Sequence, residues 1–152
     1  MLKPWLPVPH RIQQHKADCL TACVAMVLDY LGRSVSYNRL MELLNINPDL
    51  GAPASNVGRL SSLGLQVEYG PGQADQLTEH LDNGIPCVVF VDTVHLSYWA
   101  EAARHAVVLI GMDEQQVFLN APFFTEAPQI ASRLEFELAW DEMDNTYAAI
   151  TS

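Results

Sequence analysis

The sequence predicts an α+β fold, in which N-terminal helices pack on a C-terminal antiparallel sheet. Apolar residues recur at helical spacing in the first half, whereas the second half contains short β-branched runs bounded by turn residues. Helices first and strands afterwards is the order typical of α+β domains. We expect one domain over residues 1–152, because no repeat, low-complexity tract or long linker divides the chain.

Four helices are predicted in the first half, from cap residues and apolar stripes. The first follows Asp18, a good N-cap residue, and covers 19–31 with Gly32 at the C′ position. The other three are expected after Ser36, after Ser55 with Gly64 at the end, and over 75–81.

The second half is predicted to supply the sheet. The run 85–91 is continuous and β-branched, which indicates a central strand. Strands over 105–112 and 117–120 are joined by four polar residues and therefore form a hairpin. The remaining expectations are a loop or short turn over 93–104, a helix over 133–140 capped by Ser132, and an edge strand over 147–150.

Composition excludes several classes of function. The net charge of −10 argues against nucleic acid or an anionic membrane as the partner, because either would require a basic face. The same charge mildly favours neutral or basic peptide substrates. The proline-rich start is unlike a signal peptide, and no apolar run approaches the length of a membrane span, so we expect a cytoplasmic protein.

Three cysteines cannot form a complete disulfide framework. Cys23 is expected to pack inward from the first helix, and Cys87 lies within an apolar run, so both are interpreted as core residues. No metal or other cofactor is expected, because the chain lacks His-Glu-x-x-His and Cys-x-x-Cys motifs.

The candidate nucleophile is Cys19, at the start of the first helix. Unpaired backbone N–H groups and the helix dipole are expected to favour its thiolate. His105 begins an apolar strand, and a cysteine with a distant histidine is the minimal set for acyl transfer in a cleft between the two halves. His95 is interpreted as a partly exposed loop residue, and no function is predicted for His10, His15 or His80.

Several of these features together resemble the C39-type, papain-like cysteine peptidases, which include bacteriocin-processing domains of some ABC exporters. They are Gln13 six residues before Cys19, the dipeptide Asp18-Cys19, the apolar helix that follows, the strand from His105 and the hairpin to 117–122. The resemblance implies a papain-like fold and a free-standing bacterial peptidase acting on a peptide or protein substrate. It implies that Cys19 is the nucleophile, that His105 is the general base, and that the Gln13 amide donates to the oxyanion alongside the Cys19 N–H.

The third member of the family's triad is an aspartate before a proline, and here that position is Ala121. Asn120 precedes it by one residue and is chemically able to orient His105. Neighbours on a regular strand face opposite sides, so a bulge or a shorter hairpin would be needed to turn Asn120 toward the imidazole. Three interpretations therefore stay open: an active peptidase, a weakened or inactive peptide-binding domain, and another Cys–His acyl-transfer enzyme.

Overall fold

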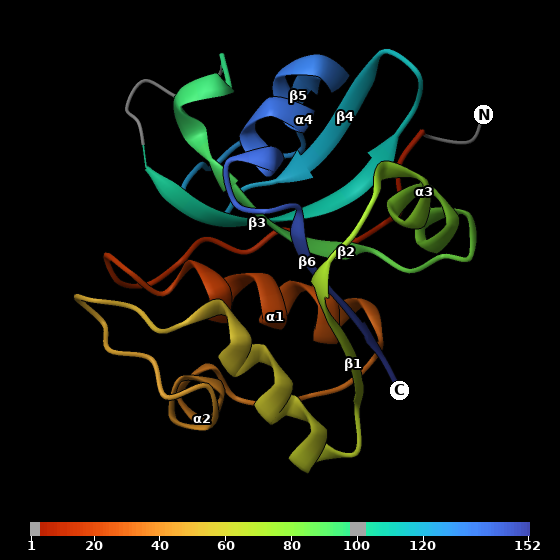
Figure 1. The fold of residues 1–152 in the computed structure, drawn as a ribbon. Coiled ribbons are helices and arrows are strands. Elements are labelled where there is room, and N and C mark those ends of the chain that lie inside the picture. The colour runs from red at the N-terminus through yellow and green to blue at the C-terminus, as the bar shows by residue number, and fades with distance from the viewer. Residues whose placement is uncertain (1–3, 98–102) are drawn as a thin grey trace.

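The computed structural model describes residues 4–97 and 103–152, which form one sheet with helices on both faces (Figure 1). The strands pair antiparallel in the order β1-β6-β2-β3-β4-β5. They are β1 (Gln66–Pro71), β2 (Cys87–Asp92), β3 (Arg104–Met112), β4 (Gln116–Asn120), β5 (Gln129–Ser132) and β6 (Thr146–Thr151). The helices are α1 (Cys19–Tyr30), α2 (Tyr37–Leu43), α3 (Ala74–Asp82) and α4 (Arg133–Asp141), with 3₁₀ helices η1 (Ala54–Leu63) and η2 (Thr93–His95).

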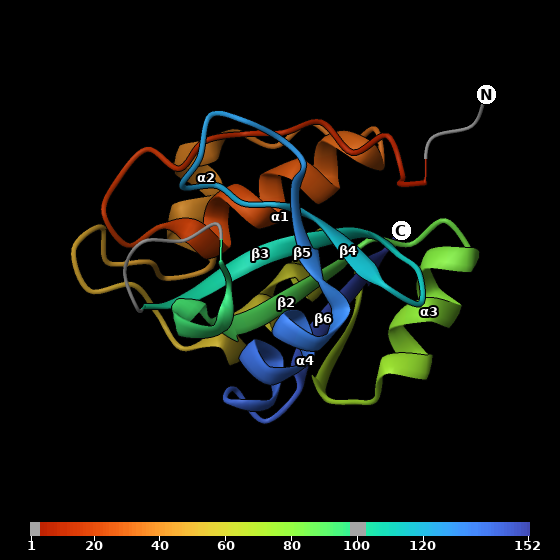
Figure 2. The same ribbon diagram turned by 90° about the horizontal axis from the view of Figure 1, so that it is seen from above.

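Each face of the sheet has its own core, because alternate strand residues point to opposite sides. In β2, Val88 and Phe90 pack with α1, whereas Val89 and Val91 pack with the residues of α4. Figure 1 shows α1 below the sheet and α4 above it, and in Figure 2 the two helices again lie on different sides of β2 and β3. Nine consecutive residues of α1 are buried, so the helix that begins at Cys19 lies at the centre of the helical half.

The helix predictions are confirmed in position, with one change of type. Ser36 and Ser132 accept hydrogen bonds from the backbone N–H groups of Arg39 and Glu135, as N-caps do. Gly32 follows α1 with a φ of +73°, a backbone conformation that favours glycine. The third predicted helix is the 3₁₀ helix η1, which Gly64 ends; Ser55 lies inside it, and Pro53 is at the N-cap, so the predicted Ser55 cap is wrong.

The sheet differs from the prediction at its margins. The strand predicted as an edge, β6, lies between β1 and β2, so the edge assignment is wrong. The edges are β1 and β5, and neither was predicted: β1 contains Gly70 and Pro71, which are typical of a turn, and both strands are largely exposed. In the segment predicted as a loop over 93–104, η2 forms a short turn, and residues 98–102 lie outside the described residues.

Residues 4–16 form an extended segment, here called the N-terminal strap, that runs along β3 and β4 toward α1. The Leu6 N–H donates to the Ile110 carbonyl at 2.8 Å, and the Gln13 N–H donates to the Pro122 carbonyl at 2.9 Å. The strap passes so close to Gly111 that a Cβ there would lie 2.5 Å from the Pro4 carbonyl oxygen. No helix described in residues 4–97 and 103–152 is long and apolar enough to cross a bilayer.

Candidate active site

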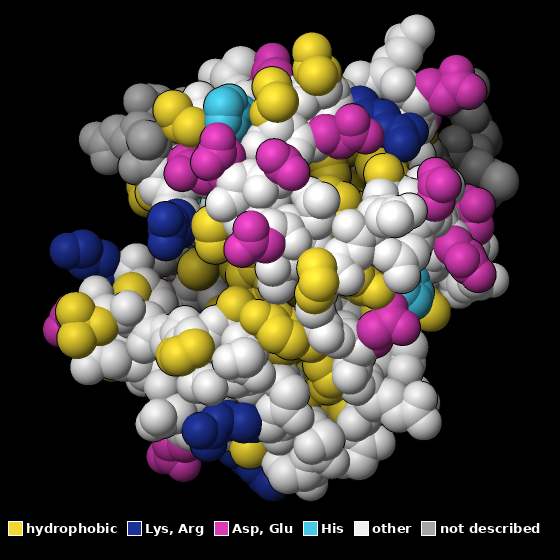
Figure 3. Space-filling model, viewed as in Figure 1, with side chains coloured by type: hydrophobic (Ala, Val, Ile, Leu, Met, Phe, Trp, Pro, Cys, Tyr) yellow, Lys and Arg dark blue, Asp and Glu magenta, His cyan; other side chains and the backbone are white. Residues whose placement is uncertain are grey.

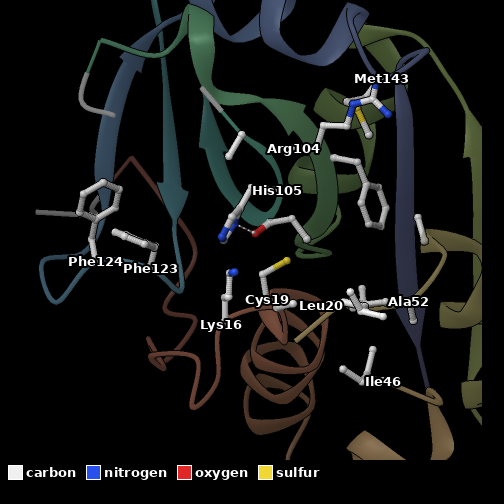
Figure 4. A pocket seen from close by; sticks show the side chains of 17 residues that line it. Lys16, Cys19, Leu20, Ile46, Ala52, Arg104, His105, Phe123, Phe124 and Met143 are labelled. Carbon is white, nitrogen blue, oxygen red and sulfur yellow. Dashed lines mark hydrogen bonds between the residues drawn. The ribbon is translucent and has the colours of Figure 1, made fainter. Parts of the chain in front are cut away.

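Cys19 and His105 line the same cavity, which has a volume of about 640 Å³ and lies between α1 and the sheet. Figure 4 shows the His105 side chain descending from β3 toward the first turn of α1, where Cys19 lies. The other walls are largely apolar, with Leu20, Ile46, Leu50, Ala52, Phe90, Phe123, Phe124 and Met143 among them. The structure therefore brings the two principal predicted residues together, although they are 86 positions apart in the chain.

The environment of Cys19 favours the neutral thiol. Burial raises the pKa of the thiol above its ordinary value, and the negative charge of Asp18 acts in the same direction. Backbone N–H groups of Ala106, Leu20 and Cys19 face the sulfur and lower the pKa, but burial outweighs them. The expectation of a thiolate is therefore wrong for this structure, because desolvation is a larger effect here than the start of the helix.

His105 is held as a neutral imidazole. Burial lowers the pKa of its ring below the usual value, and a contact with the Ala106 carbonyl partly offsets this. Nδ1 lies 3.0 Å from the Ala106 carbonyl oxygen, which can only accept a hydrogen bond, so the ring proton is on Nδ1. Nε2 is therefore the basic nitrogen of the ring. Phe123 packs edge-on against the imidazole, with ring centroids 6.3 Å apart.

Asp18 does not cap α1 with its side chain, contrary to the prediction. Its carboxylate is fully buried and turns back toward the preceding loop. There it accepts from the His15 backbone N–H at 3.0 and 3.1 Å and lies 2.7 Å from His15 Nδ1. A carboxylate with no contact to water needs such donors, so the His15–Asp18 pair closes the loop that leads into Cys19.

Gln13 is folded onto this same loop. Its Nε2 donates to the carbonyl oxygens of His15 at 2.8 Å and Lys16 at 3.1 Å. Its Oε1 is buried and has no hydrogen-bond partner among the described residues. Gln13 is therefore adjacent to the loop before Cys19, while its amide nitrogen donates to backbone carbonyls.

Asn120 lies on the opposite side of β4 from Ala121, as strand alternation predicts. It is 2% exposed, and its Nδ2 donates to the Val8 carbonyl of the N-terminal strap at 3.1 Å. Ala121 packs with Val107 in the core on the α4 face, the side of the sheet opposite to α1. Its carbonyl oxygen is 3.0 Å from His10 Nε2. Both residues of this dipeptide thus hold the strap to β4.

The mouth of the cavity has apolar residues on both rims. Leu50 is 86% exposed in the loop after α2, and Phe123 is 57% exposed after β4. Gly51, with a φ of +81°, brings this first loop against Ala17, where a Cβ would lie 3.3 Å from the Ala17 carbonyl. Sequence reasoning missed these rims; the aromatic pair Phe123-Phe124 directly after Pro122 was the available signal. Among the described residues, no group of three or more His, Cys, Asp or Glu side chains is arranged to hold a metal.

Comparisons with known proteins agree with this architecture. The model of the Peptidase_C39 like family matches residues 5–148. A protein described as a C39-like peptidase from Bacillus anthracis has a TM-score of 0.79 and 18% sequence identity, and the match covers 99% of this chain and 98% of that one. The peptidase domain of Streptococcus ComA, a bi-functional ABC transporter involved in quorum sensing, has a TM-score of 0.76 and 21% identity over 95% of this chain and 98% of that domain.

A double glycine motif protease from an AMS/PCAT transporter, solved in complex with its leader peptide, is also similar. Its TM-score is 0.73 and its identity 20%, over 98% of this chain and 94% of that one. The comparison with curated proteins gave no significant match. At these identities the structural matches establish the fold, which is papain-like, as the sequence analysis predicts.

Proposed function

Because the chain belongs to the Peptidase_C39 like family, we propose that it is a cysteine peptidase that hydrolyses a peptide bond through a thioester on Cys19. The observation that carries the proposal is the shared cavity of Cys19 and His105. The proposed compartment is the cytoplasm, where thiols such as the three free cysteines of this chain are kept reduced.

The reaction would begin from a neutral pair, since burial raises the pKa of Cys19 and lowers that of His105. As the sulfur attacks the carbonyl carbon of the substrate, its proton moves to Nε2 of His105. The imidazolium then protonates the departing amine, and the thioester remains on Cys19. His105 next takes a proton from water, whose oxygen attacks the thioester and releases the acid with the thiol restored.

The oxyanion would be stabilised by the backbone N–H of Cys19, at the start of α1. The Gln13 amide is the proposed second donor. For that role its Nε2 would exchange the carbonyls of His15 and Lys16 for the substrate oxygen.

A second candidate is a peptide-binding domain without turnover. It is favoured by Ala121 at the family's aspartate position and by the engagement of the Asn120 amide with Val8. A missing orienting residue lowers activity steeply in serine-type triads, while a thiol needs less assistance from its base.

The test is a mass-spectrometric search for new termini in a denatured protein mixture. The unaltered protein should produce cleavages that Cys19→Ser and His105→Ala lower by about a thousandfold or more. Cys87→Ser is the matched control, because Cys87 is fully buried in the α4-face core. Equal cleavage by unaltered protein and Cys19→Ser would sink the proposal, whereas peptide binding without any cleavage would favour the second candidate.

A further inference from the structure

The charge around the cavity is opposite in sign to the charge of the chain as a whole. The protein has 18 acidic and 8 basic residues. Among the described residues that line the cavity, Lys16 and Arg104 are cationic and none is acidic. Figure 4 shows Lys16 and Arg104 at different sides of the same cavity, with Cys19 and His105 between them.

Both cations are available to a ligand. Lys16 and Arg104 are exposed, and neither forms an ion pair with another residue of 4–97 or 103–152. Lys16 is three residues before Cys19, and Arg104 directly precedes His105, so each candidate catalytic residue has a cation near it in the chain. Figure 3 shows Lys or Arg side chains at the left edge of the recessed, largely hydrophobic middle of this face, with most acidic side chains elsewhere.

We propose that the cavity binds an acidic, apolar peptide segment, whose apolar side chains fill the space beside Leu20 and Phe90 and whose carboxylates face Lys16 and Arg104. This rests on the proposed function and reverses the preference for neutral or basic substrates suggested by the net charge. A buried apolar wall supplies affinity, and the flanking cations select the sign of the charge.

Besides the buried Asp18 beside Cys19, two acidic side chains near this site limit where the carboxylates of the peptide lie. Glu142 and Asp144 line a smaller neighbouring cavity of about 230 Å³, which shares Arg104 and Met143 with the first. Arg104 therefore stands at the boundary between a cationic and an acidic region. The carboxylates of the peptide are expected on the Cys19 side of it.

The test measures binding apart from hydrolysis, with Cys19→Ser protein and fluorescence anisotropy. The probes are two capped, fluorescein-labelled leucine-rich peptides that carry either glutamates or lysines at the same positions. In about 0.1 M salt, where a screening length of ~10 Å suppresses distant surface charges, the glutamate peptide should bind about five- to tenfold more tightly. Lys16→Glu combined with Arg104→Glu should reverse the preference.

Arg39→Glu is the control for net charge, because Arg39 is exposed on α2 and does not line this cavity. Equal affinities, a preference for the lysine peptide, no binding of either peptide, or the same change in Arg39→Glu would each overturn the proposal. Selective binding without any hydrolysis by the unaltered protein would contradict the proposed function alone. Hydrolysis without charge selectivity would contradict only the inference.

Discussion

The loop before Cys19 and the start of β3 hold their histidines in different ways. His15 lies 2.7 Å from a fully buried carboxylate, that of Asp18, which also accepts from the His15 backbone. His105 Nδ1 instead lies against the carbonyl of its own neighbour, Ala106. A carboxylate–imidazole pair of the kind that orients a catalytic base is therefore present here, but it stabilises the loop before Cys19.

In a catalytic triad one carboxylate both fixes the position of the histidine and stabilises its charge; in this protein the carboxylate and the site histidine are apart. A buried carboxylate with several donors fixes geometry strongly, because leaving it unsatisfied costs several kcal/mol. A backbone carbonyl fixes the tautomer of a neutral imidazole but adds no negative charge to stabilise the imidazolium. We therefore expect a precisely placed thiol and a comparatively weak base.

The largest expected effect comes from Asp18→Asn, which removes the buried carboxylate that pairs with His15. The amide retains one acceptor and turns an N–H₂ group toward the His15 donors, so the free energy of unfolding should fall by about 2–3 kcal/mol. Urea denaturation would measure this. Asp29→Asn is the control: its partly exposed ion pair with Arg11, at 3.6 Å, should be worth about 0.5 kcal/mol or less. Similar losses in the two variants would mean that the buried pair has no special role.

The next effect is a gain of hydrolytic activity, from a variant meant to give His105 a carboxylate partner like that of His15. Ala121→Asp restores a carboxylate at the position where the family carries its aspartate, and we expect kcat/KM for peptide hydrolysis to rise about tenfold. The acid limb of the pH–rate profile should also move upward. In the unaltered protein burial keeps the pKa of His105 below its usual value, and a neighbouring carboxylate favours the imidazolium.

Asn120→Ala is the companion to that variant. It leaves the Val8 carbonyl of the N-terminal strap without its amide donor, which should lower stability by about 1–2 kcal/mol. If Ala121→Asp gave no gain while Asn120→Ala abolished turnover in folded protein, Asn120 would hold the orienting role instead.

The smallest effect concerns another histidine–carboxylate pair, between α3 and the edge strand β1. His80 Nε2 lies 2.7 Å from Glu68 Oε2, and the Tyr147 hydroxyl donates to the same oxygen. These contacts, with Tyr147 first, lower the pKa of Glu68, but its side chain is 57% exposed, so Glu68→Gln should cost only about 0.5 kcal/mol at neutral pH. A carboxyl group whose pKa is lowered by folding stabilises the folded state at pH values above its ordinary pKa. The cost should therefore shrink as the pH falls below the ordinary carboxyl value of 4.5, and a difference that grew on acidification in urea titrations would contradict this.

The parts of the fold that depend on neighbouring residues could be predicted from the sequence. Ser36 and Ser132 cap their helices through residues three positions away, and the period of the second half indicates strands. The place of β6 between β1 and β2 could not be predicted, because it is decided by pairing with distant strands. The exposed edges β1 and β5 gave too weak an apolar pattern.

The candidate site divides in the same way. The chemistry of a cysteine at a helix start and of a histidine at a strand start is legible in the sequence, and the structure places both in one cavity. The raised pKa of Cys19 could not be foreseen, because it follows from burial by the rest of the chain. Asp18 accepts from His15 and does not cap α1 with its side chain. Local propensity could not predict this, because it depends on how the N-terminal strap approaches the helix.

The N-terminal strap also restricts chain length. It is tied to the sheet at Leu6, Val8, His10 and Gln13, and the loop into Cys19 begins where the last of these ties ends. One residue inserted or deleted between Val8 and Cys19 would displace the sulfur-bearing turn by up to about 3.3 Å or break a tie. Surface segments usually tolerate such changes. Here the number of residues in this interval fixes the position of the Cys19 sulfur.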